Sequence, residues 1–405
     1  MVGSTGGCCP CGVLRARFSS AKDVCAADGF DHHEELCCNC LVKQLNWRYY
    51  EDDACDQCRR RQRALETFGA TLTTRCGAAL GRTELLRIDA DAAKVFANSL
   101  DISEVKVTAG APCAPEEEER TAALLLAWNA INYSYYTDSP SPRWRWQAAD
   151  GAVVGADDEA NGVVAALAQL NAGSTQLGLP PLADASFLCT VDVSAIRETI
   201  FKAAPGAGEL PLAEQRASAL RELGEGLARL GITPLGLVRA AKSSAAALIA
   251  TLVREFPSYA DVQRLPGADD SAPLEFHKRA QLVCSMLHGA RVGGGFRDIE
   301  ALTVFADYRL PQLLRVVDVG ILHLAPALAA RIDAGEPIVR DSAEEVLLRA
   351  ATVWGATAVG DALRARAGAA DITQAQLDYY LWRTAVRRDA AGELPAFHKT
   401  RCTAY

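Results

Sequence analysis

Segments rich in alanine and leucine follow one another from about residue 76 to residue 405, and they constrain the fold more than any other feature. Between residues 212 and 230, for example, Leu220, Leu223 and Leu227 recur every three or four positions, the spacing of an amphipathic helix. Neither an internal repeat nor a Gly/Ser linker divides residues 76–405. We therefore expect a mainly α fold in which residues 76–405 form a single helical domain.

Helical spacing predicts several further helices, and a turn motif predicts one pair of strands. Trp144–Trp146 and residues 152–154 flank an Asp150-Gly151 turn, which predicts a short β-hairpin as the only convincing strand pair. Three glycines at 293–295 are expected to end a helix, since nothing resembling a phosphate-binding lysine motif surrounds them. Helices are predicted at 89–100, from 116 through 128, at 159–172, 236–256, from 276 towards 293, and at 311–320, 343–366 and 373–387.

Composition and charge narrow the class of protein. Half of the residues are hydrophobic and 23% are charged, the balance of a globular protein with a sizeable core, and no apolar run approaches the ~20 residues of a membrane span. Residues 1–75 carry ten basic and ten acidic groups, so the net charge of −8 belongs to the remaining chain. Because affinity for intact DNA or tRNA comes largely from lysine and arginine, we expect no stable nucleic-acid binding. A small phosphorylated ligand remains compatible with this charge.

The first 70 residues are expected to form a separate cysteine-rich extension. Cys37 and Cys40 are followed, after fourteen intervening residues, by Cys55 and Cys58. Two such CxxC pairs can direct four thiolates to one zinc ion, so a structural zinc site is predicted at residues 37–58. A basic run at residues 59–63 raises a nucleic-acid or protein contact, although a solvated helix start is the preferred interpretation.

The amino terminus also bears on localisation. There is no secretory signal with an apolar central region, so we expect a reducing compartment, the cytoplasm. Residues 1–22 contain Arg15, Arg17 and Lys22 but no acid, which leaves an organelle transit peptide as the alternative.

Asp307, Tyr308 and Arg309 place a carboxylate, a phenol and a guanidinium side by side after an apolar stretch. An acid between apolar packing and an aromatic ring can have its reactivity tuned. Alternatively, Asp307 caps the following helix or pairs with Arg309, and taken alone the stretch favours this structural interpretation. Two other stretches combine aromatic with polar groups, residues 132–136 and 378–382; they suit either a flat ligand ring or ordinary core packing.

Taken in order, these motifs resemble those of the queuosine salvage protein family, the queuosine 5′-phosphate N-glycosylases. The resemblance covers essentially all of residues 76–405 and differs from the usual family pattern at Tyr133, Ser134, Tyr135, Tyr136 and His277. It rests on Asn132-Tyr133-Ser134-Tyr135-Tyr136, Phe256-Pro257-Ser258-Tyr259, Phe276-His277-Lys278-Arg279-Ala280-Gln281, Phe296-Arg297-Asp298-Ile299, Phe305-Ala306-Asp307-Tyr308-Arg309-Leu310-Pro311-Gln312, Asp378-Tyr379-Tyr380-Leu381-Trp382 and the tail from Phe397-His398-Lys399 to Tyr405.

The resemblance implies a helical architecture like that of helical DNA glycosylases, and release of the base queuine from its nucleotide for reuse in tRNA. It also implies that Asp307 is the catalytic carboxylate and that Lys278 lies in the active site. A carboxylate beneath C1′ can stabilise the positive charge that develops on the sugar and can take a proton from the attacking water. No cofactor is expected for catalysis.

The leaving base is a 7-deazaguanine, whose position 7 cannot be protonated, so hydrogen bonds to the base must assist its departure. Several residues are candidates for contacts with the nucleotide. Asp298 or Asp378 can accept from the base, Tyr133, Tyr136 or Tyr259 can stack on it, and Asn132 can orient it. Lys278 and Arg309 are candidates for the 5′-phosphate, with Lys278 alternatively acting as an amine nucleophile. The rival functions are a DNA-repair glycosylase and a non-enzymatic tRNA-binding or nucleic-acid-binding module.

Overall fold

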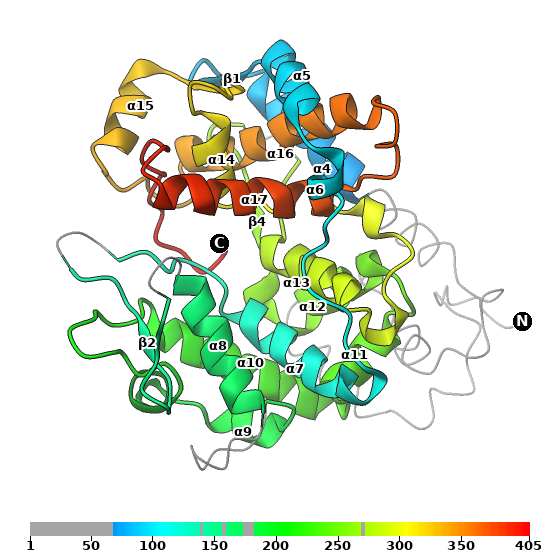
Figure 1. Ribbon diagram of the computed structural model, residues 1–405, viewed down its shortest axis with the longest axis vertical. Helices are drawn as coiled ribbons and strands as arrows, with labels where there is room; N and C mark the ends of the chain where they lie inside the picture. Colours follow the sequence, from blue (N-terminus) through cyan, green and yellow to red (C-terminus); the bar gives the residue numbers. More distant parts are fainter. Residues whose placement is uncertain (1–67, 138–140, 156–158, 173–181, 269–271) are drawn as a thin grey trace, which may run out of the picture. The chain divides into compact units, whose positions relative to one another are not determined.

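The computed structural model describes residues 68–137, 141–155, 159–172, 182–268 and 272–405, which belong to one compact unit, Phe68–Tyr405. This unit is built mainly from α-helices, as the sequence predicts (Figure 1). The predicted zinc ligands Cys37, Cys40, Cys55 and Cys58, and the possible transit peptide, lie outside the described residues.

The longer helices of the unit account for most of its structure. They are α4 (Phe68–Leu80), α5 (Ala90–Ser99), α7 (Glu118–Ala130), α8 (Glu159–Asn171), α10 (Ala213–Leu230), α11 (Pro234–Ala240), α12 (Ala245–Glu255), α13 (Lys278–Gly289), α15 (Pro326–Asp333), α16 (Ala343–Arg364) and α17 (Gln374–Ala390). Shorter helical turns are α6 (Ile102–Val105), α9 (Ala185–Thr190), α14 (Arg309–Leu314), a π-helical turn η3 (Ala195–Ile200) and 3₁₀ turns η2 (Pro115–Glu117), η4 (Pro257–Tyr259), η5 (Val292–Gly294) and η6 (Ile299–Ala301).

Three antiparallel pairs of short strands complete the described part of the chain. The predicted hairpin is present as β2 (Trp146–Gln147) and β3 (Val153–Val154), with Trp146 opposite Val154. The prediction of a single strand pair is wrong, because β4 (Val262–Gln263) pairs with β5 (Leu274–Glu275) and β1 (Leu86–Ile88) with β6 (Leu322–Leu324). Strands of two or three residues are too short to show a period of two in the sequence.

The predicted helix at 236–256 is wrong in one respect, because the structure divides it into α11 and α12. Lys242 and Ser243 have φ angles of 52° and 60°, in the left-handed region that interrupts an α-helix. Ser244 then starts α12, and its hydroxyl accepts a hydrogen bond from the backbone N–H of Ala247. The helix predicted at 311–320 is also shorter than expected, since α14 ends at Leu314.

Two hydrophobic cores organise the unit. The first is formed mainly by α7, α8 and α10–α13, and the second by α4, α5 and α14–α17. In Figure 1 most elements of the first core (cyan and green to yellow) lie below those of the second (blue, and gold to red). The cavity described below takes its walls from both sets of elements.

Helix α16 is the centre of the second core, where it packs against α4, α5, α14 and α17. It is also, within the described residues, the one helix long and apolar enough to cross a membrane, although no apolar run of about 20 residues is present in the sequence. Because 72% of that apolar window is buried inside the unit, α16 has the environment of a core helix.

Candidate active site

A cavity of about 270 Å³ opens between elements of the two cores. Six of the residues predicted for the site line it: Asn132, Tyr133, Lys278, Asp307, Arg309 and Asp378. The lining also includes Leu125, Trp128, Ser134, Tyr135, Leu282, Met286, Phe305, Tyr308, Tyr379, Trp382 and Tyr405. The structure therefore brings together motifs that lie up to 246 positions apart, between Asn132 and Asp378.

Asp307 combines the two roles that the sequence left open. Its Oδ1 accepts hydrogen bonds from the backbone N–H groups of Arg309 (2.8 Å) and Leu310 (3.2 Å), at the start of α14. Within the described residues, Oδ2 makes no hydrogen bond or ion pair, and the side chain lines the cavity. One carboxylate oxygen thus fixes the acid to the helix. The other remains available to a ligand.

Asp378, on α17, lies beside the same stretch of backbone. Its Oδ1 accepts a hydrogen bond from the backbone N–H of Phe305 (2.7 Å), and the residue is buried. Burial and then the Asp307 charge raise the pKa of the Asp378 carboxyl well above its ordinary value. Asp378 can therefore keep its proton at a pH where an exposed aspartate has lost it.

Lys278 is the first residue of α13 and supplies the cation among these acids. Its Nζ lies 3.5 Å from the carbonyl oxygen of Asn132, and the side chain is buried. Burial lowers the pKa of Lys278, while the charges of Asp307 and Asp378 oppose that shift. The ammonium group therefore lies within electrostatic reach of both carboxyl groups.

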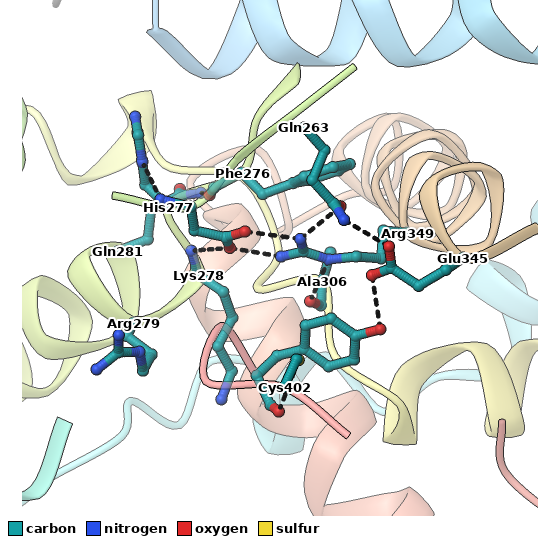
Figure 2. A network of polar contacts seen from close by, with 12 residues as sticks. Gln263, Phe276, His277, Lys278, Arg279, Gln281, Ala306, Glu345, Arg349 and Cys402 are labelled. Carbon is teal, nitrogen blue, oxygen red and sulfur yellow. Dashed lines mark hydrogen bonds and ion pairs between the residues drawn. The ribbon is translucent and has the colours of Figure 1, made fainter. Parts of the chain in front are cut away.

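A buried ion pair supports this side of the cavity (Figure 2). Arg349, on α16, binds both carboxylate oxygens of Asp261 at 2.7 and 2.5 Å. Asp261 accepts a hydrogen bond from the backbone N–H of Lys278 (3.2 Å), and Arg349 Nε donates to the carbonyl oxygen of Ala306 (3.3 Å). One ion pair thereby connects the start of α13 to the peptide group that precedes Asp307.

The charges of this pair compensate each other in a fully buried environment. Burial alone would raise the pKa of Asp261, but the adjacent Arg349 guanidinium prevails and lowers it. Arg349 also donates to Gln263 (2.8 Å), and its guanidinium lies over the ring of Phe276, 4.0 Å from the centroid. In Figure 2 the Lys278 side chain points away from Arg349, so the pair fixes the lysine backbone and leaves the amine to the cavity.

Residues 129–136 contain the end of α7, and Asn132 to Tyr135 of this segment line another part of the cavity. Three arginines bind the backbone carbonyl groups of this segment: Arg279 binds Asn129 and Ala130, Arg216 binds Ile131, Tyr133 and Ser134, and Arg401 binds Ser134 and Tyr136. Ser134 has a left-handed φ of 38°, and its hydroxyl accepts a hydrogen bond from the backbone N–H of Cys402 (3.1 Å). These contacts fix a non-helical segment in one conformation.

Arg309 also lines the cavity, but its guanidinium is engaged elsewhere. It donates to Asp389 Oδ2 (2.7 Å) and to Gln312 Oε1 (3.2 Å), and it lies over the rings of Tyr308 and Phe397. The ion pair with Asp389 compensates its charge. This geometry makes Arg309 a less effective phosphate ligand than its sequence position indicated.

The remaining three predicted residues are absent from the cavity lining. Asp298 caps α12, accepting from the Ser244 hydroxyl (2.7 Å) and from two backbone N–H groups. Tyr259 is buried, and its hydroxyl donates to the carbonyl oxygen of Leu126 (2.9 Å). Tyr136 packs against Tyr308 and lies under the Arg401 guanidinium. These positions correct the predicted base contacts, because the polar atoms of Asp298 and Tyr259 already have partners within the fold.

Three aromatic residues for which the sequence predicts no individual role line the cavity: Trp128, and Tyr379 and Trp382 of the 378–382 motif. The rings of Tyr379 and Trp382 stack at 6.3 Å with an angle of 13° between them. For Trp382 the helical spacing contained the information, since it follows Asp378 by four positions in α17. Residues four apart share one face of a helix.

The described residues contain no group of three or more histidine, cysteine, aspartate or glutamate side chains that can hold a metal ion. This finding does not bear on the four cysteines predicted to bind zinc, which precede the described region.

Comparison with known proteins identifies the family. The family model described as "Queuosine salvage protein" matches residues 113–405. A protein of Sphaerobacter thermophilus named queuosine 5′-phosphate N-glycosylase/hydrolase is 39% identical over 291 residues, covering 71% of this chain and 82% of that protein. Proteins of the same name from Mus musculus and Bos taurus are each 34% identical over 237 and 238 residues, covering 56% of this chain and 67% of theirs. The predicted resemblance is confirmed, and the chain belongs to the queuosine salvage protein family.

Proposed function

We propose that this chain hydrolyses the N-glycosidic bond of queuosine 5′-phosphate and releases queuine for reuse in tRNA modification. The names of the relatives support this activity. The observation that carries the proposal is the cavity itself, in which Asp307 has one oxygen held by the helix and one left for a ligand, beside Asp378 and Lys278. A fixed carboxylate of this kind can act on charge that develops in the transition state.

In the proposed reaction, the bond between C1′ and the base nitrogen breaks and leaves positive charge on the ribose. Asp307 stabilises that charge and accepts a proton from the water that attacks C1′. The hydroxide part of the water joins C1′, and a proton reaches the departing nitrogen. The products are queuine and ribose 5-phosphate, so water is the only co-reactant and no cofactor is required.

We assign the base to Asp378 and the phosphate first to Lys278. The raised pKa of Asp378 allows its carboxyl group both to donate and to accept hydrogen bonds, which suits the polar edge of a 7-deazaguanine. Lys278 offers an ammonium group that lacks a carboxylate partner in direct contact within the described residues. Tyr379 and Trp382 provide aromatic surfaces for the base.

Two finer points belong to the same proposal. The helical framework is of the kind found in helical DNA glycosylases, and the acidic body suits a small nucleotide better than a duplex. The cysteines at 37, 40, 55 and 58 hold a structural zinc ion. Metal analysis of the purified protein tests the second point, with a Cys37→Ser variant expected to lose the zinc.

The activity is tested by incubating the purified chain with queuosine 5′-monophosphate and analysing the products by mass spectrometry. We expect free queuine and ribose 5-phosphate in equal amounts. Parallel incubations with queuosine-containing tRNA and with damaged duplex DNA examine the two rival functions. Base release from the duplex alone, or no base release from any of the three, would overturn the proposal in favour of a DNA-repair glycosylase or a non-enzymatic binding module, respectively.

A further inference from the structure

The segment at residues 129–136 rests on two buried arginines that no carboxylate of the described residues neutralises. Arg216 is fully buried and donates only to backbone carbonyl groups, including that of Tyr133 (2.7 Å) and that of Pro211 (2.8 Å). Arg279 is 1% exposed and likewise binds only carbonyl oxygens, among them that of Asn129 (3.3 Å). Within the described residues, neither guanidinium forms an ion pair. Their positive charges are therefore uncompensated and raise the electrostatic potential along this side of the cavity.

Tyr133 lies directly against these charges. The Arg216 guanidinium is 4.6 Å from the centroid of its ring and the Arg279 guanidinium 5.2 Å. With two guanidinium groups over the ring, the ring is already packed and is poorly placed to stack on a base, which corrects the role predicted from the sequence. The part of Tyr133 left for a ligand is its hydroxyl group.

That hydroxyl has no hydrogen-bond partner in the part of the chain that the structure describes, although Tyr133 is only 2% exposed. The indole Nε1 of Trp128, which lines the same cavity, is buried and lacks a partner in the same way. A buried polar group without a partner costs free energy, so native proteins rarely retain one without a use. Trp128 Nε1 can only donate, and the Tyr133 hydroxyl can donate, so both suit acceptor oxygens.

We propose that the Tyr133 hydroxyl and Trp128 Nε1 form, together with the Lys278 ammonium group, the subsite for the 5′-phosphate of the nucleotide. The inference rests on the proposed function and adds to it the place of the phosphate. Lys278 joins the two donors because its Nζ is 3.5 Å from the carbonyl oxygen of Asn132, the residue before Tyr133. Donors backed by uncompensated positive charge favour a dianionic group over the neutral base or ribose.

The test is a comparison of Tyr133→Phe with Tyr259→Phe, two changes that each remove one buried hydroxyl. Tyr133→Phe should lower kcat/KM for the 5′-monophosphate by about tenfold or more, the effect of losing a hydrogen bond to a charged group. The value for the unphosphorylated nucleoside should change less than about threefold. Tyr259→Phe should leave both values unchanged, because its hydroxyl binds Leu126 outside the cavity.

The two variants should also differ in stability, and here Tyr259→Phe should show the larger loss. Tyr133→Phe removes a hydroxyl that has no partner, so the Tm should stay the same or rise; Tyr259→Phe loses a formed hydrogen bond, so the Tm should fall. Unchanged kinetics in Tyr133→Phe would overturn the proposal. An equal loss for monophosphate and nucleoside would also overturn it, since the hydroxyl would then contact the base or ribose.

Binding measurements keep this result separate from the fate of the proposed activity. In an Asp307→Asn background, calorimetric titration with queuosine 5′-monophosphate should show weaker binding when Tyr133→Phe or Trp128→Phe is added, with the nucleoside as reference for each. If the wild-type chain binds the monophosphate but releases no queuine, the proposed function fails while the subsite is still decided by these titrations. Equal monophosphate affinity in all three proteins would contradict the subsite.

Discussion

Buried arginines support both sides of the cavity, but the two sides differ in what those arginines bind. The carboxylate wall, with Asp307 and Asp378, rests on Arg349, whose charge is compensated by Asp261. The arginine-backed wall, residues 129–136, rests on Arg216 and Arg279, whose hydrogen-bond acceptors among the described residues are carbonyl groups. The same type of side chain therefore makes a neutral support on one wall and a positive one on the other. We infer that this difference orients the nucleotide, with its base and C1′ at the carboxylate wall and its phosphate at the arginine-backed wall.

The largest expected effect comes from breaking the neutral support. Arg349→Met leaves the Asp261 carboxylate buried and unpaired, so the free energy of unfolding should fall by about 3–5 kcal/mol. Denaturant titration measures this change. The matched control is Lys94→Met, which removes an exposed ion pair with Asp91 and should cost less than about 1 kcal/mol. Similar losses in the two variants would show that Arg349 is not the support described here.

Removing the charge of Asp307 should affect chemistry and leave the fold intact. Asp307→Asn should lower kcat by a hundredfold or more, about 3 kcal/mol of transition-state stabilisation, with little change in nucleotide affinity. An asparagine oxygen can still accept from the N–H groups of Arg309 and Leu310, so the Tm should change little. Asp307→Ala, which also loses the cap, should be about 1 kcal/mol less stable. An unchanged kcat in Asp307→Asn would show that the Asp307 carboxylate does not take part in the reaction.

Lys278 lies where the two walls meet, and its removal shows to which of them it belongs. Lys278→Ala should reduce kcat/KM for the monophosphate about tenfold or more, while the nucleoside should lose much less, because only the former carries the charge that the ammonium group binds. Steady-state kinetics with both substrates measures the ratio. An equal loss for both would assign Lys278 to the carboxylate wall, as a partner of Asp307 and Asp378.

The smallest expected effect is a change in how the free energy of unfolding depends on pH when Asp378 is replaced. Burial and Asp307 raise the pKa of this carboxyl group in the folded protein, so the folded state retains a proton that the unfolded state loses above a pH of about 4. Stability contributed by that proton is present below the unfolded pKa and declines as the pH rises towards the folded pKa, by at most about 1.4 kcal/mol per pH unit. Asp378→Asn should remove this decline in denaturant titrations above pH 4. If the free energy of unfolding changed with pH in the same way in the wild type and in Asp378→Asn, the raised pKa of Asp378 would be contradicted.

The sequence contained those parts of the fold and site that depend on neighbouring residues. The helix predicted at 89–100 is present as α5, and the motif around Asp307 supplies both its helix cap and its place in the cavity. The spacing of Trp382 also held usable information, because it shares a face of α17 with Asp378.

The remaining features depend on contacts between distant parts of the chain. Arg216 lies 83 positions from the Tyr133 carbonyl that it binds, and Arg349 lies 88 positions from Asp261. In a sequence both are ordinary basic residues of amphipathic helices, and carbonyl groups are the same at every position. Asp298 was misassigned for a related reason, because the helix that it caps begins 53 positions earlier in the chain. From the sequence alone, we expect the Asp298 carboxylate to be free for a ligand, whereas in the structure it binds the start of α12.

The most direct test of this division of the cavity is a crystal structure of the Asp307→Asn variant with queuosine 5′-monophosphate bound. We expect the phosphate within hydrogen-bond distance of the Tyr133 hydroxyl and Trp128 Nε1, the base edge at Asp378, and C1′ beside residue 307. A nucleotide bound in the reverse direction, with its phosphate towards Asp378 or away from residues 129–136, would contradict it.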